Sequence, residues 1–115
     1  RADELADKLV SRAVSYGLRA WKDGAYPGWT PNPSSNLLAL CQQVYTAQFG
    51  QPASLQVIHA GLECGPLAAT YPHLDMISFG PDIRGAHAPG ERVEIASVGR
   101  CWQLLKAVLQ ALAKA

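Results

Sequence analysis

Apolar and polar positions follow a helical spacing in three stretches of the chain. Over residues 2–21, apolar side chains recur every three or four positions, which predicts an amphipathic helix with one apolar face. The same spacing predicts a second helix over residues 36–49, preceded by serine caps and ended by Gly50. It also predicts a final helix capped by Ser97. The apolar positions of that helix are Val98, Trp102, Leu105, Val108, Leu109 and Leu112.

Two continuous apolar runs, residues 55–59 and 74–79, predict short buried strands. A short helix over residues 66–70, opened by Pro66, separates them, and residues 92–95 alternate as a short edge strand would. Because strands alternate with helices, the order predicts an α/β domain with a small, mostly parallel sheet packed by helices. A sheet of two or three strands is thin. We therefore expect further strands from missing chain or from another copy.

A connector over residues 22–33 divides the chain. It holds three prolines and two glycines, which favour an extended linker or hinge over regular structure. The predicted organisation is a helix over residues 1–21, a linker, and an α/β segment over residues 34–115. The chain also begins at Arg1 within a helical pattern, which predicts a fragment of a longer protein.

Composition excludes several classes of protein. With 49% apolar and 17% charged residues among 115, the chain is expected to be globular rather than disordered. A net charge of +1 without a dense basic cluster gives little support for nucleic-acid binding. The longest apolar run is far shorter than the roughly 18–20 residues that span a bilayer. The three cysteines have no CxxC spacing, which disfavours a disulfide framework and indicates a reducing, cytoplasmic setting.

Polar residues with chemical potential follow the two apolar runs. In open α/β sheets, ligands bind where the carboxyl ends of strands meet, so we expect function in these two loops. After the first run come His59, Glu63 and Cys64, and after the second come Asp82, Arg84, His87 and Glu91.

His87 has two interpretations that the local sequence leaves open. A loop histidine at the end of a strand is a zinc-ligand candidate, but the local sequence alone favours a surface or loop-capping residue. A catalytic zinc requires about three protein ligands. Only His59 and Glu63 lie nearby in the predicted sheet, and their spacing is not a strong metal motif.

The segment GLECG, residues 61–65, also has two interpretations. It approaches the pattern of a nucleophile elbow, but Glu63 occupies the central position and Cys64 lies one place later. A Cys64–His87 pair would be a thiol hydrolase. Alternatively, the glycines let backbone N–H groups approach a substrate carboxylate at a helix N-terminus.

The segments HAGLECG and PHLDMISFGPDIRGAHAPGERVEI closely resemble the carboxyl-terminal part of the Xaa-His dipeptidases. These enzymes are also called aminoacylhistidine or cytosol non-specific dipeptidases, of the zinc aminoacylase/carboxypeptidase superfamily. The resemblance is strong from about residue 26 to residue 105. It implies an α/β catalytic domain with an inserted lid, two zinc ions, dipeptide substrates and homodimers built largely through the lid. Residues 1–21 would be the last lid helix, 22–33 the hinge and 34–115 the returning catalytic segment.

The resemblance also implies roles for individual residues. His87 matches a histidine that ligates one of the two metals, and Gly61, Leu62 and Glu63 match a loop that borders the substrate pocket. Glu91 matches the acid that closes the histidine loop, where we expect a structural role. The loop departs from the family after His87, since Ala-Pro-Gly-Glu stands where Ser-Pro-Asp-Glu is expected.

The rest of the implied metal site lies in the amino-terminal region of the family. In the complete enzyme the metals would polarise the scissile carbonyl and acidify a water, which a glutamate would deprotonate. This chain would supply one ligand and one wall of the pocket, so we expect no catalytic residue and no activity from it alone. Two alternatives remain: a non-catalytic α/β association module, and a hydrolase that uses Cys64.

Overall fold

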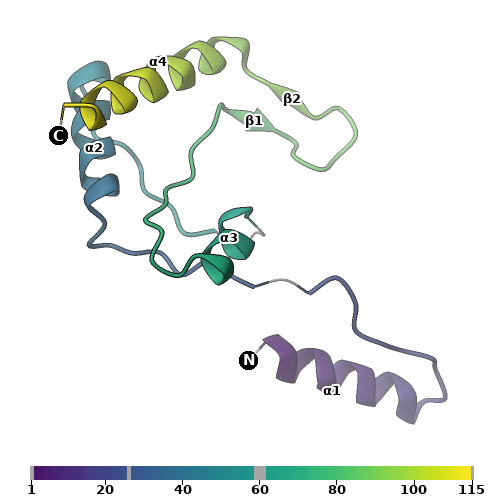
Figure 1. Ribbon diagram of the computed structural model, residues 1–115. Helices are drawn as coiled ribbons and strands as arrows, with labels where there is room; N and C mark the ends of the chain where they lie inside the picture. The colour runs from purple at the N-terminus through teal and green to yellow at the C-terminus, as the bar shows by residue number, and fades with distance from the viewer. Residues whose placement is uncertain (1, 26, 59–61, 115) are drawn as a thin grey trace.

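The structure is a computed structural model that describes residues 2–25, 27–58 and 62–114. Figure 1 shows four helices, two short strands and long connecting segments. In chain order the elements are α1 (Ala2–Ser15), α2 (Asn36–Phe49), α3 (Cys64–Thr70), β1 (Ile83–Arg84), β2 (Arg92–Val93) and α4 (Ile95–Leu112).

Helix α1 ends at Ser15, six residues before the predicted end at residue 21. Gly17 adopts a left-handed conformation with φ 76°, and its N–H donates to the carbonyl of Val14 at 2.8 Å. A left-handed glycine just beyond the last turn ends a helix, because it satisfies the final carbonyls while turning the chain away. The apolar face of α1 remains uncovered, with Leu9 63% exposed.

Helix α2 has the predicted bounds. The Ser35 hydroxyl accepts from the backbone N–H of Leu38 at 2.9 Å, and Gly50 ends the helix with φ 71°. Helix α2 packs on α4, where Cys41 and Val108 are only 8% and 4% exposed. Cys41 lies on the apolar face of the predicted helix and is a core residue, and its burial raises the pKa of the thiol.

Helix α3 begins at Cys64, two residues earlier than predicted. Pro66 still lies in the first turn, where its missing N–H breaks no helical hydrogen bond. The buried Gly65 lies directly against the connector. A Cβ atom at this position would overlap the carbonyl oxygen of Pro27.

The prediction of a mostly parallel sheet is not met in the described residues. Residues 55–58 and 74–79 form no strand, and His59 lies outside the described residues. Instead, β1 and β2 pair antiparallel, with Ile83 opposite Val93 and Arg84 opposite Arg92. An antiparallel hairpin finds its hydrogen-bond partners within a few residues of sequence. A buried parallel strand needs a neighbour brought by a distant segment. We call residues 55–58 and 74–79 the unpaired apolar segments.

Helix α4 begins at Ile95, so Ser97 lies inside its first turn and not at its cap. The prediction of residues 92–95 as a strand is correct only for β2, while β1 lies in a segment predicted to be loop. Ser97 is buried, and its hydroxyl accepts a hydrogen bond from the backbone N–H of Asp82, fifteen residues earlier.

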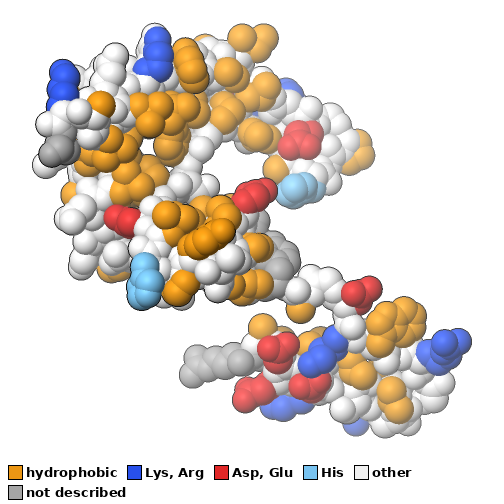
Figure 2. Space-filling view, viewed as in Figure 1, with side chains coloured by type: hydrophobic (Ala, Val, Ile, Leu, Met, Phe, Trp, Pro, Cys, Tyr) orange, Lys and Arg blue, Asp and Glu red, His pale blue; other side chains and the backbone are white. Residues whose placement is uncertain are grey.

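The chain is open in shape. Its radius of gyration is 19.1 Å, against about 13 Å for a compact domain of this length. Its accessible surface is 9555 Å², where a compact protein of 12.3 kDa exposes roughly 6,100 Å². Figure 2 shows apolar side chains gathered on the visible surface, and α1 lies apart from the other helices in Figure 1.

Candidate functional site

His87 lies in the loop that joins β1 to β2. Two turns shape this loop, because the Ala88 N–H donates to the Gly85 carbonyl and the Glu91 N–H donates to the Ala88 carbonyl, both at 3.1 Å. Gly85 and Gly90 take left-handed conformations, with φ 66° and 84°. The loop is therefore a defined double turn, and His87 within it is exposed.

His87 itself has φ 63°, and no other non-glycine residue of the described ranges has a positive φ. A residue with a side chain is strained in this conformation by about 1–2 kcal/mol, although histidine is among those that tolerate it best. Strain of this kind persists only where the surrounding structure enforces it. The sequence predicted the loop and its histidine but gave no sign of the conformation.

The base of the hairpin is fixed to α4 by four residues, Asp82, Glu94, Ser97 and Arg100, which we call the hairpin anchor. The Ser97 hydroxyl accepts from the Asp82 N–H at 2.8 Å and donates to the Glu94 carbonyl at 2.6 Å. The Glu94 N–H donates to the Asp82 carbonyl at 2.9 Å. The Arg100 guanidinium lies 3.1 Å from the Asp82 carboxylate and 3.4 Å from that of Glu94.

The first predicted loop is placed less completely. Leu62 is half-buried, and Glu63 is exposed at the N-cap of α3 without a side-chain cap bond. Gly61 lies outside the described residues, as does His59. Of the GLECG segment, the structure therefore describes residues 62–65.

Cys64 and His87 lie on separate elements, the first residue of α3 and the hairpin loop. No hydrogen bond between them occurs in the described part of the chain. The strand that a nucleophile elbow requires before its turn is also missing from residues 55–58. Nothing in the geometry favours the Cys64 hydrolase.

Asp75 is a structural residue that the sequence did not single out. Its carboxylate accepts from the Ser35 hydroxyl at 2.8 Å and from the Leu37 N–H at 3.3 Å. It thereby joins the second unpaired apolar segment to the start of α2. An aspartate at a helix N-terminus is favoured by the unsatisfied N–H groups there, but its separation from α2 in sequence hid the role.

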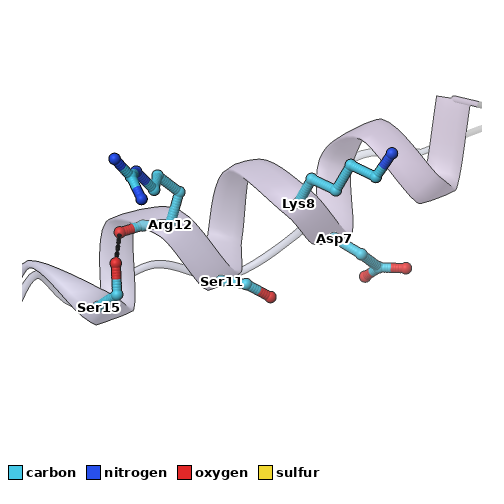
Figure 3. A pocket seen from close by; sticks show the side chains of 5 residues that line it. All are labelled: Asp7, Lys8, Ser11, Arg12 and Ser15. Carbon is cyan, nitrogen blue, oxygen red and sulfur yellow. Dashed lines mark hydrogen bonds between the residues drawn. The ribbon is translucent and has the colours of Figure 1, made fainter.

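A hollow on α1 is not a candidate site (Figure 3). All of its lining comes from this one helix, and the side chains spread outward without enclosing a volume. Ligand pockets are concave and take walls from several elements. The lining residues are Asp7, Lys8, Ser11, Arg12 and Ser15.

Comparison with known proteins accounts for nearly all of the chain. It is 42% identical over 108 residues to the cytosol non-specific dipeptidase of Escherichia coli, covering 94% of this chain. The crystal structure of an aminoacylhistidine dipeptidase from Vibrio alginolyticus matches 95% of the chain at 39% identity and a TM-score of 0.70. The chain resembles one segment of these dipeptidases. It spans 22% of the length of each, and no family model matches it.

The likeness to a dipeptidase confirms the resemblance that the HAGLECG and GAHAPGE motifs indicated. The structural match also shows that this chain shares the fold of the corresponding part of a solved dipeptidase, although the described residues form no parallel sheet. The unpaired apolar segments and the open shape are what a segment of about a fifth of a dipeptidase would show without its surroundings.

A metal site is not complete within this segment. In residues 2–25, 27–58 and 62–114, no three His, Cys, Asp or Glu side chains gather closely enough to hold a metal ion. His87 offers one imidazole, and about three protein ligands are required for a catalytic zinc. The described residues therefore do not fit a whole metal centre. No helix among them is both long and apolar enough to cross a membrane.

Proposed function

We propose that this chain is the segment of a metal-dependent dipeptidase that presents His87 to the metal centre. The observation that carries the proposal is the 42% identity to a dipeptidase over nearly the whole chain. It is supported by the conformation of His87, which a double turn holds exposed and strained. Exposed strain at a potential ligand is typical of functional sites.

In this proposal the remaining ligands and the general base come from the part of a dipeptidase that this chain does not span. The metals would be a pair of zinc ions, and His87 would bind one of them. Gly61, Leu62 and Glu63 would border the pocket that holds the dipeptide. Glu91 would have a structural role, in keeping with its backbone hydrogen bond to Ala88, which closes the loop.

The proposal extends to location and assembly by likeness alone. A relative named for the cytosol supports a cytoplasmic enzyme, and the three free cysteines suit a reducing compartment. The complete enzyme would be a homodimer. The uncovered apolar face of α1, on the segment expected to be lid, supports association through that region.

Replacing the matching segment of the Escherichia coli dipeptidase with this chain tests the proposal. The chimaera should hydrolyse a Xaa-His dipeptide in a chelator-sensitive manner, while the 115-residue chain alone should not. His87→Ala in the chimaera should lower kcat/KM at least about a hundredfold and lower the zinc content, because a direct ligand matters at least as much as its outer-shell supports.

His73→Ala is the matched control, since His73 is also exposed but lies in a turn after α3. It should leave both activity and zinc content unchanged. Hydrolysis by the chain alone would contradict the expected inactivity. Full zinc content in the His87→Ala chimaera would contradict the ligand assignment.

A second candidate function rests on a different observation. The unpaired apolar segments expose large side chains, with Val57 77% exposed, and an uncovered strand-forming segment can pair with another chain. The chain would then act as an association module without catalysis. Light scattering over a concentration series tests this, and a monomer at every concentration would exclude it.

A further inference from the structure

Ser97 is one of two buried polar side chains among the described residues. Its hydroxyl acts both as a hydrogen-bond acceptor and as a hydrogen-bond donor. It is 4% exposed, it accepts from Asp82 and it donates to Glu94. Buried hydroxyls are retained where their hydrogen bonds are satisfied. A serine that served only to begin α4 would not need a partner fifteen residues earlier.

The two hydrogen-bond partners of Ser97 lie at the open end of the hairpin, one beside each strand. Asp82 immediately precedes β1, and Glu94 immediately follows β2. One hydroxyl therefore joins the chain entering the hairpin to the chain leaving it. The Glu94 N–H also donates a hydrogen bond to the Asp82 carbonyl at the open end of the hairpin. Arg100, one turn further along α4, forms ion pairs with the carboxylates of both residues.

The hairpin has little internal stability. Its strands are two residues each, and a two-stranded hairpin is marginally stable in water even when longer. Arg84 lies directly opposite Arg92, and like charges in that position repel. The loop must also hold His87 at a positive φ. The hairpin therefore requires support from outside its own strands.

We infer that the hairpin anchor, and Ser97 above all, is a positioning device that holds the His87 loop in its working conformation. The hydroxyl of Ser97 bonds to the backbone of Asp82 and Glu94, which leaves no direct role in catalysis. It acts through Asp82 and Glu94 on the loop that they enclose. The value of the device for catalysis rests on the proposed function of His87, whereas its effect on the hairpin does not.

Amide hydrogen exchange of the 115-residue chain tests the structural step. Ser97→Ala should accelerate exchange at Asp82 and Glu94 roughly ten- to hundredfold, because it leaves the Asp82 N–H without its buried partner. Exchange in α2 and the far-ultraviolet circular dichroism should not change. Ser97→Thr keeps the hydroxyl and should restore protection. Ser11→Ala, the same change on the exposed surface of α1, is the control.

Zinc affinity of the chimaera, measured by competition with a chelator, tests the functional step. Ser97→Ala should weaken zinc binding roughly tenfold to a hundredfold, as loss of a supporting residue does in other metal sites, and Ser97→Thr should recover it. A general loss of packing would not be repaired by a hydroxyl alone. Arg100→Gln should have a smaller effect of about threefold, because its ion pairs are exposed.

The outcomes separate this inference from the proposed function. Unchanged exchange at Asp82 and Glu94 in Ser97→Ala would overturn the positioning role. So would normal zinc affinity in Ser97→Ala alongside weakened affinity in His87→Ala, and in that case the ligand assignment would stand. If His87→Ala left zinc affinity unchanged, the proposed function would fail, and the exchange data alone would decide the role of the anchor in the hairpin.

Discussion

The hairpin and the unpaired apolar segments differ in whether strand partners lie nearby in the sequence. The hairpin, supported by α4, has such partners, and the two segments do not. The hairpin is as short as a sheet can be, yet it forms, because Asp82, Glu94 and Ser97 satisfy one another within sixteen residues of sequence. The unpaired segments carry stronger strand-forming sequences, yet none of residues 55–58 or 74–79 is in a strand. Strand formation depends on available partners more than on the residues of the strand.

The largest expected effect is on the free energy of unfolding, and a valine-to-aspartate substitution in each region tests it. Val108→Asp places a charge in the contact between α2 and α4 and should lower the free energy of unfolding by about 3 kcal/mol or more. Val57→Asp, in an unpaired segment, should change it by less than about 0.5 kcal/mol. Thermal unfolding followed by circular dichroism measures both. Equal losses would show that residues 55–58 are packed in solution.

A second prediction concerns the contact between α3 and the connector. Gly65→Ala should destabilise the chain by about 1–3 kcal/mol, because the new methyl group would meet the Pro27 carbonyl oxygen. Gly99→Ala in α4 is the matched control, since nothing lies near its Cβ position. It should stabilise by about 0.5–1 kcal/mol through helix propensity. Chemical denaturation of the two variants should give shifts of opposite sign, and shifts of the same sign would refute the close approach.

The hairpin loop gives a third prediction of about 1 kcal/mol. His87→Gly should stabilise the hairpin by roughly that amount, because glycine adopts a positive φ without strain. Ala86→Gly, one residue earlier and without a positive φ, should destabilise it slightly. Hydrogen exchange at Glu94 reports on both. If His87→Gly loosened the hairpin, the imidazole would be supporting the loop and not merely carried by it.

The smallest effect is expected at α1. The hydrogen bond that the Lys22 ammonium donates to the Asp7 carboxylate raises the pKa of Lys22, and the negative charges of Asp7 and Asp3 add to the shift. While Asp7 is ionised, a raised pKa means that the pair stabilises the folded state below the ordinary lysine value of 10.5, and that this contribution is lost as the pH rises through the higher folded value. Helicity should fall slightly above that point. Lys22→Gln should remove the pH dependence, and an unchanged profile would show that the pair contributes nothing.

Features with local causes were predictable from the sequence. Helix α2 follows from Ser35 and Gly50, which cap it at both ends, and Cys41 follows from its apolar face. The His87 loop was found because its glycines and proline exclude regular structure. Helix α1 is shorter than predicted because the left-handed Gly17 ends it, although apolar residues continue the helical spacing beyond that glycine.

Features with distant causes were not predictable. Ser97 looked like a helix cap, but its hydroxyl is used by Asp82. The parallel sheet was predicted from two apolar runs that have no strand partner within the described residues. The resemblance predicts a ligand role for His87, while its strained φ depends on the hairpin as a whole. Local sequence reveals the elements of this segment, but not the elements that depend on distant segments.

The bond between Asp75 and the start of α2 has a consequence for the order of events during synthesis. Residues 36–49 leave the ribosome well before Asp75, so α2 must first form with Ser35 as its only side-chain cap. Its N-terminal turn then remains prone to fraying until Asp75, 40 residues beyond Ser35, has been made. The second unpaired segment thus carries a carboxylate that caps the N-terminus of a helix synthesised before it. Nascent α2 would be held at that end by a residue translated later.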